Sequence, residues 1–98
     1  MDYWEITKRG EDGTRYVIRI RMNRKKLVID EIGVIPKGKR LTRWLTHAIR
    51  DNYSWRKLNS EDRAKAIQDM FKEKVPNGLM EQALTEAWKS IKPSGLSF

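Results

Sequence analysis

Residues 14–22 read TRYVIRIRM, and this stretch decides the class of the fold. Large apolar side chains occupy every second position, which is the pattern of a β-strand that is buried on one face and solvated on the other. The expected buried face carries Tyr16, Ile18, Ile20 and Met22, and the opposite face carries Arg15, Val17, Arg19 and Arg21. We therefore predict a strand with a basic side, whose three arginines have no acidic partner at alternate positions.

Two further strands flank this one. Residues 3–9 predict the first strand, which the GEDG loop at residues 10–13 joins to the second as a hairpin. The third strand is predicted over residues 27–35 and is apolar on both faces, which is an aggregation risk at the edge of a sheet. Three explanations stay open: this strand lies in the middle of the sheet, both of its faces are covered, or it pairs in a homodimer through residues 27–35.

The hydrophobic period changes near Pro36, and three amphipathic helices are expected beyond it. They cover about residues 41–52, the segment from Asn59 or Ser60 to Pro76, and residues 77–92. The predicted fold is α+β: a three-stranded antiparallel sheet followed by three amphipathic helices, in the order βββααα.

A chain of 98 residues with 39% apolar residues is expected to form a single domain over residues 1–98. Residues 1–36 would form the sheet, residues 41–92 the helical part and residues 93–98 a flexible tail. The chain contains no cysteine, which excludes disulfides, thiol nucleophiles and thiolate metal sites. No apolar run reaches membrane-spanning length, so we expect a cytoplasmic protein without a membrane partner.

Several large apolar residues are predicted to lie in the core. Leu41 and Trp44 fall on the apolar stripe of the first helix, and Trp88 falls on that of the third. Trp4 on the first strand is expected in the core as well. Trp55 lies between the first two helices, and we expect it to fill the space between them rather than to stack on bases.

The positive charge is concentrated in one part of the sequence. Residues 15–43 hold ten basic and two acidic residues, a net charge of +8 that equals the net charge of the whole chain. Such a concentration favours an anionic partner, and nucleic-acid backbones are the commonest polyanions. The residues expected to bind nucleic acid are Arg15, Arg19, Arg21, Arg24, Lys25, Lys26, Lys37, Lys39, Arg40, Arg43 and Arg50.

The basic loop before the first predicted helix suggests a particular phosphate contact. Cations are disfavoured at a helix N-terminus, whose free N–H groups already present positive potential. A phosphate bound there would resolve this conflict, and Gly38 would let the backbone approach it. Farther along the same predicted helix, Arg43, His47 and Arg50 would share one face.

Catalytic chemistry is not expected. His47 and Asp51 have the spacing of a base and its orienting acid on a helix, but no nucleophile with a recognisable motif accompanies them. Asp30 and Glu31 are adjacent in a predicted strand and point to opposite faces, so they cannot chelate one metal ion together. We therefore predict no enzyme activity, no metal and no cofactor, and we expect His47 on the surface.

A sheet that bears arginines and is followed by an amphipathic helix, over residues 3–52, is similar to small DNA-binding domains that read DNA with a sheet. This resemblance implies a sheet face docked on duplex DNA, with one or two arginines at base edges. We predict a non-enzymatic nucleic-acid-binding protein that favours DNA over RNA. The alternative is a small regulatory or inhibitory module, of the kind encoded by phages or plasmids, that docks its basic face on an acidic protein.

Overall fold

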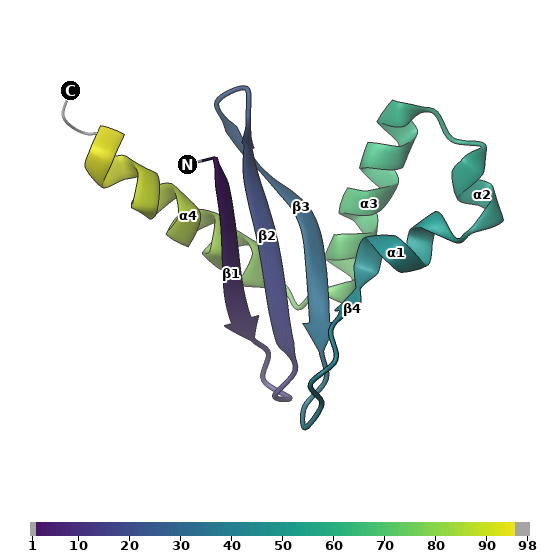
Figure 1. Ribbon diagram of the computed structural model, residues 1–98, viewed down its shortest axis with the longest axis horizontal. Helices are drawn as coiled ribbons and strands as arrows, with labels where there is room; N and C mark the ends of the chain where they lie inside the picture. Colours follow the sequence, from purple (N-terminus) through teal and green to yellow (C-terminus); the bar gives the residue numbers. More distant parts are fainter. Residues whose placement is uncertain (1, 96–98) are drawn as a thin grey trace.

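The computed structural model describes residues 2–95, with side chains through Ile91. An antiparallel sheet comes first in the chain and helices follow, which confirms the α+β class (Figure 1). The elements are β1 (Tyr3–Arg9), β2 (Arg15–Asn23), β3 (Lys26–Ile35), β4 (Arg43–Trp44), α1 (Leu45–Arg50), α2 (Tyr53–Arg56), α3 (Ser60–Lys74) and α4 (Leu79–Gly95). The described part thus has four strands and four helices where three of each were expected.

The core lies between one face of the sheet and the long helices. The strands are ordered β1-β2-β3-β4, and Ile18 at the centre of β2 pairs with Ile6 and Ile32 on its two neighbours. We call this apolar side the inner face. Helix α4 crosses it and contacts β1, β2 and β3 (Figure 1). The Trp4 indole N–H donates to the Ser90 hydroxyl, which ties the half-buried Trp4 to this helix.

The first of the three explanations for the apolar third strand, a place in the middle of the sheet, holds at one end of the strand. Gly33 and Val34 pair with β4, so this end of β3 lies between two strands. Closer to the other end, the side-chain amide of Gln68 on α3 donates to the Ile29 carbonyl at 3.2 Å. Contacts within the chain therefore cover part of the edge that a homodimer through residues 27–35 would use, and that homodimer stays a prediction.

The first predicted helix begins later than expected, at Leu45 instead of residue 41. Arg43 and Trp44 form β4 instead, and this pairing with β3 takes up backbone groups that a helix would have used. Leu41 is 85% exposed, so its assignment to an apolar helical stripe is wrong. Trp44 is half-buried on the side of the sheet opposite the inner face, not in the main core.

The two long helices follow the sequence more closely. Asn59 caps α3 by accepting from the backbone N–H of Asp62, and the helix ends before Pro76 as predicted. Trp88 is 45% exposed, which corrects its expected place in the core. Ala83 and Ala87, both fully buried, bring α4 close to the sheet, so the larger indole lies to one side.

Helix α4 also continues farther than the expected tail boundary. It runs to Gly95 although Pro93 was expected to end it. A proline removes one backbone hydrogen bond, and a helix whose earlier turns pack on a sheet can carry that loss. The rest of the expected flexible tail, residues 96–98, lies outside the described residues. Within residues 2–95, every helix is too short or too polar to cross a lipid bilayer.

Candidate nucleic-acid interface

The arginine row of β2 lies on the side of the sheet opposite α4, which we call the outer face. Two of its three arginines have acidic partners, which come from the neighbouring strands and not from alternate positions of β2 itself. Arg19 Nε is 3.0 Å from Glu5 Oε2 on β1, and its guanidinium lies 4.0 Å from the centre of the Trp44 ring. Arg21 Nε is 3.1 Å from Asp30 Oδ1 on β3. The centre of the outer face is therefore a set of ion pairs and not a free basic strip.

Arg15, the third arginine of the row, has a structural role. Its Nη2 donates to the backbone carbonyl of Lys39 at 3.4 Å. This contact joins the start of β2 to the loop between β3 and β4. The half-buried Arg15 thus helps to hold that loop against the sheet.

The turn between β2 and β3 presents three adjacent cations, Arg24, Lys25 and Lys26, which we call the turn cluster. Arg24 and Lys25 have φ values of 51° and 67°, as in the two-residue hairpin turns that match the twist of the strands. All three residues are exposed, and no ion-pair partner for any of them is present among residues 2–91. The prediction that this turn extends the basic surface is consistent with its position.

A second group of cations lies on the loop between β3 and β4 and at the first residue of β4. Lys39, Arg40 and Arg43 are exposed and have no ion-pair partner in the described side chains, and we call them the loop cluster. Lys37 is placed differently, because its side chain lies against the β1–β2 hairpin. A methyl group built on Gly13 would lie 2.8 Å from Lys37 Cδ.

At the start of the first helix, where a phosphate contact is predicted, a carboxylate of the chain itself already lies. Glu31 Oε1 accepts from the backbone N–H of Thr46 at 3.0 Å, and Glu31 Oε2 accepts from the Thr46 hydroxyl. Because α1 begins at Leu45, the loop cations precede its first turn. They remain available for another ligand.

Arg43, His47 and Arg50 do not share a helical face as predicted, because Arg43 belongs to β4. His47 and Arg50 lie on α1 and are exposed, as expected for His47. Arg50 stands at the C-terminal end of that helix and belongs to neither cluster. The structure thus divides the predicted site into a turn cluster, a loop cluster, a paired centre and the separate Arg50.

The two clusters lie at opposite ends of the sheet. Figure 1 shows the β2–β3 turn at one end and the β3–β4 loop at the other. Strand β2, which connects these ends, has nine residues. At about 3.3 Å per residue, the ends of such a strand are about 26 Å apart.

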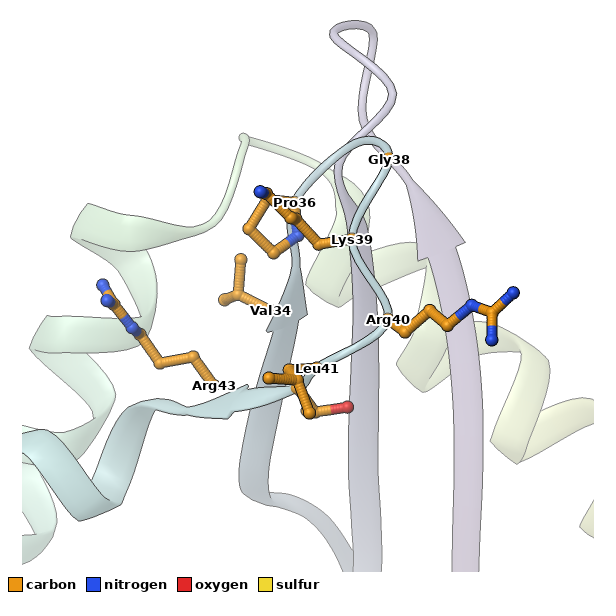
Figure 2. A pocket seen from close by; sticks show the side chains of 8 residues that line it. Val34, Pro36, Gly38, Lys39, Arg40, Leu41 and Arg43 are labelled. Carbon is orange, nitrogen blue, oxygen red and sulfur yellow. The ribbon is translucent and has the colours of Figure 1, made fainter.

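A hollow of about 580 Å³ lies beside the loop cluster. Val34, Pro36 and Leu41 provide its apolar lining, and Lys39 and Arg43 are at its rim (Figure 2). In the same view the Arg40 side chain points the other way, across the sheet. The sequence did not indicate that Val34, Pro36 and Leu41 line a hollow, because a strand end, a loop and a helical stripe explain these three residues just as well.

Residues 2–91 contain no group of three or more His, Asp or Glu side chains that could hold a metal ion. Comparison of the chain with protein-family models, with curated proteins and with solved structures finds no match. The arrangement of charge is therefore the main guide to function.

Proposed function

We propose that the protein binds the phosphate backbone of nucleic acid, with duplex DNA favoured over RNA, through the turn cluster and the loop cluster. The observation that carries this proposal is the pair of exposed cation groups at the two ends of one sheet, whose described members lack acidic partners. When clustered cations of this kind contact phosphates, the counterions condensed on the nucleic acid are released. This release drives binding.

The separation of the clusters suits a single duplex. Duplex DNA carries one negative charge per about 1.7 Å of its axis, so a length of about 26 Å carries about 15 phosphate charges over its two strands. Each cluster can therefore contact its own phosphates without competing for them. Since Arg19 and Arg21 are engaged in ion pairs, the contacts we propose are to the backbone and not to base edges.

Salt-dependent titration of a labelled duplex tests this function. If the six cations of both clusters neutralise about six phosphates, the logarithm of affinity falls with the logarithm of salt concentration at a slope of about −5. Charge reversal of the turn cluster, Lys25→Glu with Lys26→Glu, should make the slope shallower by about 2 and weaken binding equally for all sequences. The same is expected for Lys39→Glu with Arg40→Glu.

A matched control reverses two exposed lysines on α3, Lys65 and Lys72, which makes the same change in net charge away from both clusters. This variant should keep a slope within about one unit of the unmodified protein. A wild-type slope shallower than about −2 would disprove the proposal. Equal weakening by the α3 variant would show that net charge, and not the clusters, causes binding.

The second candidate function is docking on an acidic protein. The mixed charge at the centre of the outer face favours it, because the Arg19–Glu5 and Arg21–Asp30 pairs place both signs of charge there, and a protein surface can complement such a pattern whereas a uniformly anionic backbone cannot. This function predicts weak binding to every polyanion and tight 1:1 binding to one protein. Titration of duplex DNA, single-stranded DNA and RNA at two ionic strengths separates the two candidates.

A further inference from the structure

We propose that the hollow beside the loop cluster binds an unpaired nucleobase of the nucleic acid that the two clusters hold. This inference rests on the proposed function and adds a ligand class to it. The site is the space of about 580 Å³ between the end of β3 and the following loop. A single nucleotide fits in a hollow of this size, because small-molecule sites in proteins begin at about 300 Å³.

The lining of the hollow is apolar where a base would lie. Val34 and Pro36 come from the end of β3 and the residue after it, and Leu41 comes from the loop (Figure 2). Leu41 is 85% exposed and so has most of its side chain available to a ligand. Proteins that take a base out of its stack receive it between aromatic or apolar side chains.

The loop that carries Leu41 is held at several points. The Lys39 N–H donates to the Pro36 carbonyl at 3.0 Å, and Arg15 donates to the Lys39 carbonyl. The Thr42 methyl group lies so close to β3 that a methyl group built on Gly33 would be 2.4 Å from it. Because this loop, which forms one side of the hollow, is already held in position, little conformational entropy is lost when a ligand enters.

Charge selects a nucleotide over an uncharged apolar ligand. Lys39 and Arg43 extend on two sides of Val34 in Figure 2, and no acidic residue lines the hollow. The phosphates on either side of an unpaired nucleotide are therefore placed to meet one cation each while the neutral base contacts the apolar lining. Arg40 also lines the hollow, and its guanidinium extends the other way, across the sheet, where it remains available to the adjoining duplex.

A bulged duplex tests this inference. Three probes of the same length are compared: a fully paired duplex, a duplex with one bulged 2-aminopurine nucleotide, and a duplex with one bulged abasic nucleotide. We expect about tenfold tighter binding to the bulged base than to the paired duplex, with a change in 2-aminopurine fluorescence. The abasic bulge controls for the extra flexibility of bulged DNA and should bind like the paired duplex.

Variants at Leu41 assign the effect to the hollow. Leu41→Ala should remove the tenfold preference and leave both the paired-duplex affinity and the salt slope unchanged. Leu41→Met conserves volume and should keep the preference. Tyr53→Ala, at another exposed residue on a different element, should also keep it. Thermal melting of each variant checks that the fold is intact.

The failure of this inference can be told apart from the failure of the proposed function. A normal salt slope with equal affinity for all three duplexes would overturn the base-binding inference and leave phosphate binding standing. Equal preference for the abasic and the base-bearing bulge would overturn it as well. A slope shallower than about −2 on every probe would remove the proposed function, and the inference with it.

Discussion

Replacing Glu31 with alanine should destabilise the fold, because this carboxylate joins β3 to α1. Glu31 Oε1 accepts from the backbone N–H groups of Ile32 at 2.9 Å and Thr46 at 3.0 Å, and Oε2 accepts from the Thr46 hydroxyl. Thr46 is 2% exposed, so the substitution leaves its amide and its hydroxyl without partners and shielded from water. At about 1–3 kcal/mol for each such group, the free energy of unfolding should fall by about 3 kcal/mol.

Urea unfolding measures this loss directly, and the melting temperature should fall by roughly 15 °C in a domain of this size. Glu31→Gln is the matched control, since its amide oxygen still accepts from both N–H groups and its amide nitrogen can donate to the Thr46 hydroxyl oxygen. The control should cost less than about 1 kcal/mol. The reasoning is refuted if Glu31→Ala unfolds within about 1 kcal/mol of the unmodified protein, or if both variants lose the same stability.

Two further predictions concern the contact between β3 and β4 and the hairpin between β1 and β2. Gly33→Ala places a methyl group 2.4 Å from Thr42 Cγ2 and 2.8 Å from Trp44 Cζ3. Strand β4 then has to move away from β3, which should lower the free energy of unfolding by about 1–3 kcal/mol. Unchanged stability in urea would contradict this contact. The pKa of Asp12 is lowered, chiefly by the Thr14 backbone hydrogen bond and to a smaller extent by Lys37. The stability from this shift is complete well above the unfolded pKa of about 4 and is lost as pH falls through the lower folded pKa. Asp12→Asn should therefore flatten the decline of unfolding free energy on the acid side of about pH 4, and an unaltered acid profile would count against the assignment.

Residues 36–44 show where sequence reasoning reaches its limit. Leu41, Trp44 and Leu45 have helical spacing, and only Leu45 is both helical and buried in the structure. Gly33 explains why the start of the predicted helix is not helical, because its missing side chain lets Thr42 and Trp44 approach β3. This contact joins residues about ten positions apart, so no local period predicts it.

The candidate site divides in the same way. The exposure of Arg24, Lys25 and Lys26 follows from a short turn between two strands and was predictable. The ion pair between Arg19 and Glu5 was not, because it depends on the register between β1 and β2. The row of basic residues in the strand therefore predicted how much positive charge the sheet carries. It did not predict which of these side chains remain without an ion-pair partner.

By itself, the sequence determined the second strand with its inner face, the start of α3 at one of two residues and its end before Pro76, the sheet-then-helix order and the concentration of cations. These depend on the geometry of one segment, in which side chains repeat every two or 3.6 residues along the backbone. Only the tertiary structure decided that Glu31 would occupy the start of α1, that Arg19 and Arg21 would be paired, and that Leu41 would stand exposed beside a hollow. Each of those outcomes arises from contacts between segments distant in the chain, whose register and close approach are set by packing and not by local periodicity.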